Sequence, residues 1–302
     1  MNILIFGASG FLGRYLMPLL LHDPRVTSIK AVTHRAALPQ EWMGEKLTAR
    51  TVDEFFSGED MASHKGHYDV ALCLCGRTYS QTSDEAVIQD ANASMPIKVV
   101  DFCRKAEVRH MILASSVNVR LLDCHKRGYP LYKKMAEDHL IASGVPFTIF
   151  RPTLIFGDGE GGVAKLVKHM QKYRIMPVLG DGQKLEQPIH VQEAAEFFYK
   201  AAMTPPENGI FEIGGLAAMT YNMMLQKIAS FLKRKITLLH LPIRPFTLTL
   251  DFLERRGCGL SVNSEQLVHI DTDLDTDNQP ALQHYPVKLR PFDEWLSTLR
   301  LK

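Results

Sequence analysis

The stretch "NILIFGASGFLGRYLMPLLL", residues 2–21, decides the fold. "NILIF" is a short apolar run of the kind that forms a strand buried on both faces of a sheet. Glycines at positions 7, 10 and 13 follow at once, and a helical pattern comes next. A glycine-rich turn between a strand and a helix lets backbone amides approach a pyrophosphate. The spacing is G-x-x-G-x-x-G and not G-x-G-x-x-G, but its place between strand and helix predicts a dinucleotide-binding turn. The alternative is a tight turn without a ligand.

Strands and helices alternate through the first two thirds of the chain. Further strand-like runs are "YDVALCLCG" (68–76), "RHMILASS" (109–116), "VPFTIFRP" (145–152) and "GIFEIGG" (209–215). Helical patterns are "MPIKVVDFCRKAEV" (95–108), "YPLYKKMAEDHLIASG" (129–144) and "QPIHVQEAAEFFYKAAM" (187–203). This alternation implies right-handed crossovers and a parallel sheet with helices on both faces. We therefore predict an α/β fold with a doubly wound parallel (Rossmann) sheet and a smaller C-terminal substrate lobe.

The predicted domains are interleaved along the chain. Residues 1–155 form the dinucleotide-binding Rossmann domain, to which 187–215 return. Residues 156–186 and 216–302, where the pattern loosens and prolines recur, form the smaller substrate-side lobe.

The end of the second strand, "SIKAVTHRA" (28–36), bears on the choice of cofactor. In this kind of fold an acidic residue about 20 residues past the glycines hydrogen-bonds the ribose of NAD. No Asp or Glu occurs from Arg25 to Gln40. His34 and Arg35 stand there instead, and Arg14 follows the third glycine, and guanidinium groups suit a 2′-phosphate. The pattern favours NADP over NAD; the alternative for Arg35 is a solvated loop charge.

Composition limits the possible partners and the cell compartment. The 302 residues carry 35 basic and 33 acidic side chains, a net charge of +2. This balance gives no electrostatic case for nucleic acid or an anionic membrane. Five cysteines fit free thiols in a reducing cytosol better than a metal site. No secretory signal and no apolar run of membrane-spanning length is visible, so we predict a cytoplasmic protein without a metal or a membrane span.

Several short motifs carry a family resemblance that covers roughly residues 1–215. They are "GASGFLG" (7–13), "LCG" (74–76), Asn92, "LASSVNV" (113–119), "YPLYKKMAE" (129–137), "RPTLIFGDG" (151–159) and "PIHVQEAA" (188–195). With them the chain resembles the extended or atypical branch of the short-chain dehydrogenase/reductase superfamily. That branch includes nucleotide-sugar epimerases and dehydratases and the nicotinamide-binding accessory subunit of respiratory complex I.

The resemblance implies a catalytic site made of Tyr129, Lys133 and Ser116. In the family a Tyr-x-x-x-Lys pair acts with an upstream hydroxyl, and Tyr132 does not match because Ala136 stands four residues on. Positions i and i+4 share a helix face, so the Lys133 ammonium is expected beside the phenol and should lower its pKa. Ser116 would hydrogen-bond the substrate oxygen. The link of thirteen residues from Ser116 to Tyr129 is shorter than in many sugar-nucleotide enzymes of this branch.

The same resemblance, with the strand ends, implies a set of cofactor contacts. The predicted residues are Gly7, Ser9, Gly10, Phe11, Leu12, Gly13, Arg14, His34, Arg35, Asp53, Cys75, Gly76, Tyr129, Lys133 and Pro152. Asp53 corresponds to an acid that often approaches the adenine.

Two functions follow as alternatives. The first is an NAD(P)-dependent oxidoreductase or epimerase/dehydratase acting on a carbonyl, hydroxyl or nucleotide-sugar substrate. The second is an NADP(H)-binding assembly or sensor protein without turnover, because the complex I-like members bind the cofactor without evident turnover. The intact Tyr129–Lys133 pair favours the first. We predict a small-molecule substrate, no nucleic acid partner, and a monomer or homodimer.

Overall fold

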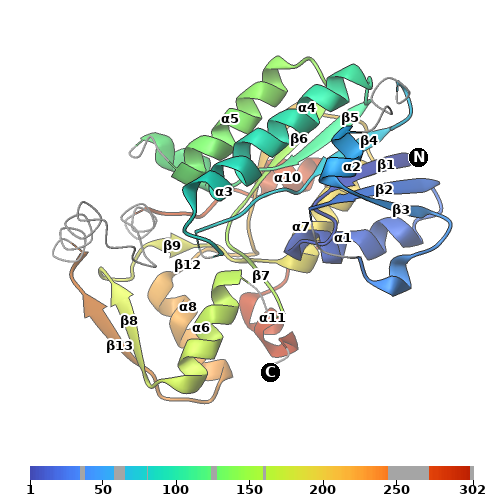
Figure 1. Cartoon of the computed structure of the whole chain (residues 1–302). Coiled ribbons are helices and arrows are strands. Elements are labelled where there is room, and N and C mark those ends of the chain that lie inside the picture. The colour runs from blue at the N-terminus through green and yellow to red at the C-terminus, as the bar shows by residue number, and fades with distance from the viewer. Residues whose placement is uncertain are drawn as a thin grey trace.

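The computed structural model describes residues 1–34, 38–57, 65–79, 81–123, 128–158, 161–243 and 272–299. Its centre is a seven-stranded sheet in the order β11-β6-β5-β4-β1-β2-β3 (Figure 1). All neighbouring pairs in this sheet are parallel. The strands are β1 (Asn2–Phe6), β2 (Ser28–Thr33), β3 (Leu47–Thr51), β4 (Val70–Cys73), β5 (His110–Ala114), β6 (Phe147–Pro152) and β11 (Gly209–Ile213). The strand order reverses beside β1, which confirms the predicted doubly wound sheet.

Helices cover both faces of the sheet (Figure 1). On one face pack α1 (Phe11–His22), α7 (Val191–Ala202) and α10 (Gln279–His284). On the other pack α2 (Val52–Ser57), α4 (Met95–Lys105) and α5 (Gly128–Ala142). Successive side chains of β1 point to opposite faces of the sheet and so contribute to both hydrophobic cores. Ile3 and Ile5 face the first set of helices, and Leu4 and Phe6 face the second. This is why "NILIF" is apolar at every position after Asn2.

A smaller set of elements surrounds a second core. It consists of α6 (Gly161–Lys172), β8 (Ile175–Leu179), α8 (Tyr221–Phe231), β13 (Thr237–Leu241) and α11 (Phe292–Thr298). We call this set the small lobe; its core includes Phe156, Met176, Leu225 and Trp295. β8 and β13 pair in parallel at its margin (Figure 1).

Short strand pairs connect the small lobe to the main sheet. β7 (Ile155–Phe156) pairs with β10 (Ile189–His190), and β9 (Leu185–Glu186) pairs with β12 (Met219–Thr220). The remaining short elements are η1 (Gln40–Trp42), α3 (Glu85–Gln89), the π-helical turn η3 (Asp90–Ser94) and η4 (Val117–Asp123). Among the described residues, no helix is both long and apolar enough to cross a membrane.

The C-terminal helix α11 is held against the start of α7. The Trp295 ring stacks on His190 at 3.6 Å between centroids, and its Nε1 donates to the buried Glu193 carboxylate at 2.8 Å. The Arg290 guanidinium also lies over the Trp295 ring, 4.7 Å from its centroid. His190 Nδ1 in turn accepts the Gln192 backbone N–H and so caps α7. His190 therefore has a structural role.

Predicted and observed elements differ mainly at their ends. β4 covers four residues of the predicted strand 68–76, and Asp69 just before it accepts the Asn2 backbone N–H through its carboxylate. The helix predicted over 187–203 begins at Val191, because the preceding residues pair as β10.

Candidate functional site

The turn after β1 is built so that only glycine fits at two of its positions. Gly7 has φ +89°, in the left-handed region, and its N–H donates to Val32 O at the end of β2. A Cβ on Gly13 would lie 2.3 Å from Gly7 O and 2.5 Å from Ala8 O, so no side chain can be placed there. The first turn of α1 is thereby packed directly against the loop. The turn lies at the reversal in strand order, where dinucleotides bind in doubly wound sheets.

The start of α1 leaves its N–H groups without a side-chain partner. Gly10 occupies the N-cap position with no side-chain cap, and the first turn holds no acidic residue. Such a helix end suits the negative charge of a phosphate. The Phe11 ring lies against a second glycine-rich loop, because a Cβ on Gly157 would be 3.2 Å from Phe11 Cζ. Gly157, which follows β7, therefore lies beside the glycine turn at residues 7–13.

Lys133 is a buried lysine held by two backbone carbonyls. Its Nζ donates to Ala114 O at 2.9 Å, at the end of β5, and to Cys75 O at 3.1 Å, just after β4. Its exposed fraction is 4%. Burial lowers the pKa of Lys133, while the nearby Cys73, Cys75 and Glu137 raise it. The ammonium is thus fixed between two strand ends at the carboxyl edge of the sheet.

Tyr129 and Ser116 share a side-chain hydrogen bond. Ser116 follows β5 and is 8% exposed, and Tyr129 lies in the first turn of α5. The Lys133 ammonium lies 6.0 Å from the centre of the Tyr129 ring. The three side chains of the predicted site are therefore neighbours at one edge of the sheet.

The predicted lowering of the Tyr129 pKa is wrong for this structure. Burial raises the pKa of Tyr129 to about 12, and the Ser116 hydrogen bond offsets only part of that rise. The physical reason is that the phenolate would lose water on burial, while the Lys133 ammonium is turned toward the Ala114 and Cys75 carbonyls. The phenol is consequently protonated at neutral pH.

Asn92 also belongs to this edge, although it was absent from the predicted site residues. It lies in the π-helical turn η3, is fully buried, and donates through Nδ2 to Arg77 O and Ile88 O at 2.7 Å each. Its Oδ1 is buried and has no partner among the described residues. A Cβ on Gly76 would lie 3.1 Å from that oxygen and 3.0 Å from Lys133 Nζ. The signal for Asn92 in the sequence was its place among the motifs of the family resemblance.

The other predicted cofactor residues lie along the same edge with different exposure. The exposed residues among them are Gly10, Arg14, His34, Asp53 and Gly76. Ser9, Phe11 and Cys75 are partly buried. Leu12 packs its side chain into the core beneath α1, and Pro152 is buried at the end of β6 opposite Ile213. Arg35 lies outside the described residues. No cluster of three or more His, Cys, Asp or Glu side chains that could hold a metal occurs in the part of the chain that the structure describes.

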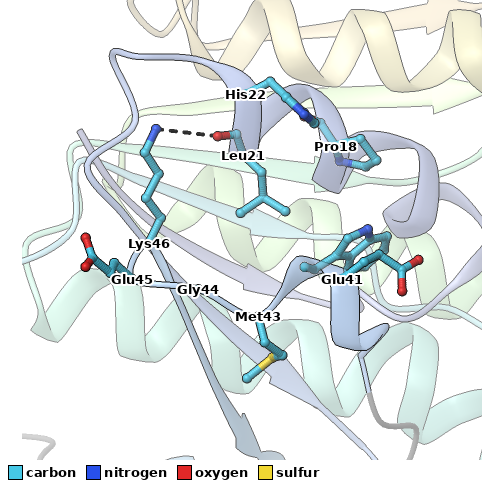
Figure 2. Close-up of a pocket in the computed structure, with 9 residues that line it drawn as sticks. Pro18, Leu21, His22, Glu41, Met43, Gly44, Glu45 and Lys46 are labelled. Atoms are coloured by element: carbon cyan, nitrogen blue, oxygen red, sulfur yellow. Dashed lines mark hydrogen bonds between the residues drawn. The ribbon is translucent and has the colours of Figure 1, made fainter.

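Two cavities lie at the opposite end of α1 from the glycine turn. One, of about 400 Å³, is bounded by Pro18, Leu21 and His22 of α1 and by the segment Glu41–Lys46 (Figure 2). The other, of about 570 Å³, lies across Pro18 and His22 and reaches Tyr199. Because α1 runs away from the carboxyl edge of the sheet, neither cavity includes a predicted site residue.

Comparison with known proteins agrees with this arrangement. The chain is 24% identical to N-acetyl-alpha-D-glucosaminyl-diphospho-ditrans,octacis-undecaprenol 4-epimerase of Escherichia coli O157:H7, over 80% of this chain and 75% of that protein. It is 25% identical to ceramide reductase of Caulobacter vibrioides, over 98% and 93% of the two chains. It is 22% identical to the mitochondrial NADH dehydrogenase [ubiquinone] 1 alpha subcomplex subunit 9 of Dictyostelium discoideum, over 74% and 62%.

Among solved structures, UDP-glucuronic acid 4-epimerase of Bacillus cereus, in complex with UDP-glucuronic acid and NAD, shares the fold. Its TM-score is 0.73 at 15% identity, over 98% of this chain and 97% of that chain.

The sheet order, the glycine turn and the neighbouring Ser, Tyr and Lys side chains are those of an extended short-chain dehydrogenase/reductase. The chain belongs to the NAD dependent epimerase/dehydratase family, whose sequence model matches residues 3–214. The resemblance, including that to the complex I subunit, is thereby confirmed.

Proposed function

We propose that this protein is an NAD(P)-dependent enzyme that exchanges hydride with a carbon bearing a hydroxyl or carbonyl oxygen. One observation carries the proposal: the Tyr129 phenol, hydrogen-bonded to Ser116, stands one helical turn before a lysine fixed at the same sheet edge. The similarity to proteins named as a 4-epimerase and a reductase supports this proposal. Substrate candidates therefore include ketones, aldehydes, nucleotide sugars and lipid-linked alcohols.

The residues at the edge fit a bound dinucleotide. At Gly13 the glycine turn has no room for a side chain, and Asn92 Oδ1 is a buried acceptor with no partner among the described residues. When bound, the nicotinamide supplies or accepts the hydride. The chain's own groups would do the rest: Ser116 orients the substrate oxygen, Tyr129 donates a proton to it, and Lys133 holds positive charge beside the ribose. At neutral pH the Tyr129 phenol is protonated, as donation to a carbonyl oxygen requires.

The test of this proposal is the Tyr129→Phe variant. A panel of aldehydes, ketones, lipid-linked ketones and nucleotide sugars first identifies a substrate. Tyr129→Phe should then lower turnover on the order of 10²-fold or more, because the proton donor is lost while the ring remains. Dinucleotide affinity should change little. Tyr132→Phe, in the same turn of α5, is the matched control and should keep near-normal turnover; wild-type turnover by Tyr129→Phe would refute the role.

NADP is the proposed cofactor, ahead of NAD. The support is Arg14, exposed near the start of α1, Arg35 in the sequence after β2, and the absence of an acidic residue between positions 25 and 40. Fluorescence titrations should show tighter binding of NADPH than of NADH. Arg35→Ala should weaken NADPH on the order of tenfold, because a charge-assisted hydrogen bond is lost, and leave NADH unchanged. Equal affinities of the wild-type protein for NADPH and NADH would contradict the proposal that its arginines bind the 2′-phosphate.

A binding protein without turnover is the second candidate, favoured by the similarity to the NADH dehydrogenase subunit. Tight NADPH binding with no turnover across the whole panel would support it and count against the enzyme.

Further parts of the proposal concern organisation and context. We propose that residues 1–155 and 187–215 form the dinucleotide-binding domain, and that 156–186 and 216–302 form the substrate-side lobe, except that α10 within the last range packs on the main sheet. A small-molecule substrate, a cytoplasmic location, and a monomeric or homodimeric state complete it.

A further inference from the structure

The charges of this chain are strongly segregated, although their sum is small. The segments 161–180 and 216–243 carry eight Lys and Arg residues and no Asp or Glu. The whole chain has 35 basic and 33 acidic residues, so the remainder has 27 against 33. These two segments contain α6, β8, α8 and β13 of the small lobe. The balanced total therefore combines two strongly basic segments of the small lobe with an excess of acidic residues in the rest of the chain.

The basic residues concentrate in two turns that lie side by side. One turn, Lys172–Arg174, joins α6 to β8, and the other, Lys233–Lys235, joins α8 to β13. Thr237 N–H donates to Arg174 O at 2.8 Å, and Arg234 donates to Gln171 O, so the two turns are in contact. Lys172, Arg174, Lys233 and Lys235 are exposed. Within the described ranges, no carboxylate lies within salt-bridge distance of these four side chains.

The sheet that continues from these turns has an apolar outer face. Met176 and Val178 of β8 point into the core of the small lobe. The alternate residues point outward: Ile175, Pro177 and Leu179 from β8, with Thr237, Leu239 and Leu241 opposite them on β13. Ile175 and Leu239 are 56% and 48% exposed, and Tyr173 in the first turn is 47% exposed. In Figure 1, β8 and β13 lie at the margin of the molecule with α6 and α8 on their inner side.

We propose that this face, which consists of the two basic turns and the outer side of β8–β13, docks the protein on an anionic lipid bilayer. Stable attachment to a membrane surface needs two signals, apolar insertion and attraction to anionic headgroups, and both occur here on one face. Tyr173 suits the interface because its ring is apolar and its hydroxyl is polar. A nucleic acid would use the cations but would leave Ile175 and Leu239 without a purpose. The inference goes beyond the proposed reaction and depends on none of its residues.

Co-sedimentation of the full chain with vesicles tests the docking. Vesicles of phosphatidylglycerol and phosphatidylcholine should bind the protein, and pure phosphatidylcholine should bind it far more weakly. Binding should fall steeply as salt rises from 0.05 to about 0.5 M, because the surface potential is screened. Equal binding to both vesicles, or binding to neither, would overturn the proposal.

Matched variants locate the face. Lys172→Gln with Lys235→Gln should weaken binding to the anionic vesicles about 30-fold, at roughly fivefold per lost cation. The control, Lys98→Gln with Lys105→Gln, removes two exposed lysines from α4 and should stay within about twofold of wild type, since these lie on the main sheet's helices. Ile175→Ser with Leu239→Ser should weaken binding on the order of tenfold, whereas Ile141→Ser, 45% exposed on α5, should not.

Two results would contradict the assignment. Equal losses in the test and control pairs would show that general charge, and not this face, binds the vesicles. Binding of duplex DNA that is lost in the Lys172/Lys235 variant but unchanged by Ile175→Ser with Leu239→Ser, without vesicle binding, would make the face a nucleic-acid surface. Urea unfolding of each variant checks that it is folded. The wild-type vesicle comparison stands even where a variant fails to fold.

Discussion

Three buried polar side chains form one hydrogen-bonded chain between the main sheet and the C-terminal part of the protein. His110 Nε2 lies 2.9 Å from Thr148 Oγ1, and that oxygen lies 3.2 Å from the Tyr285 hydroxyl. His110 Nδ1 is buried without a partner among the described residues. A proton on His110 would therefore add an uncompensated charge to the interior, and burial lowers the pKa of His110 to about 4.

This histidine should make the protein acid-sensitive. Its unfolded-state pKa is near 6.5 and its folded-state pKa is lower, so its contribution is complete above pH 6.5 and is lost as the pH falls toward 4. At pH 5 the loss should be about 2 kcal/mol. In His110→Gln, whose amide can still reach Thr148, the free energy of unfolding should fall less steeply between pH 7 and pH 5 than in wild type. Urea unfolding at several pH values measures both slopes, and parallel slopes would contradict the assignment.

Helix α5 carries its functional side chains on one face at intervals of four residues. Tyr129, Lys133 and Glu137 follow one another along that face. Glu137 is fully buried and accepts two hydrogen bonds from Arg151 at the end of β6, at 2.9 and 2.6 Å. Arg151 lies 3.9 Å from Glu212 on β11. The helix that presents Tyr129 is thus fixed to β6 by a buried ion pair, whose arginine also lies near β11.

Removing one partner of the Glu137–Arg151 ion pair should lower the free energy of unfolding strongly, whereas replacing both partners should lower it little. Glu137→Gln leaves the Arg151 guanidinium largely buried beside an amide, and we expect a loss of about 3 kcal/mol in the free energy of unfolding. Glu137→Met with Arg151→Met replaces both charges by apolar groups and should recover most of that loss. Urea unfolding of Glu137→Met, of Arg151→Met and of the double variant gives the coupling energy. Wild-type stability in Glu137→Gln would show that the pair contributes nothing.

At the scale of the whole molecule, local patterns predicted the main sheet and left the small lobe vague. The run "NILIF" and the glycine turn are local signals, because burial on both faces and a turn without side chains each leave a mark in the sequence. Strand pairs of two residues, such as β7–β10 and β9–β12, have no period to detect. They form because distant segments meet.

In the candidate site, too, some features could be predicted from local sequence and others could not. Spacing on one helix was enough to place Tyr129 beside Lys133, and the end of a predicted strand was enough to bring Ser116 near them. The raised pKa of Tyr129 and the unpartnered Asn92 Oδ1 depend on burial by residues from several elements. No single segment of the sequence carries that information.

The strand that completes the main sheet has a consequence for synthesis on the ribosome. β11 pairs with β6, yet about fifty-five residues, including α6 and β8, are translated between them. Until residue 213 has left the exit tunnel, the growing chain presents β6 with an open edge that can pair with other extended chains. The first half of the small lobe is by then already outside. A pause in translation just before residue 209 would therefore lengthen the period in which the nascent protein is most prone to aggregate.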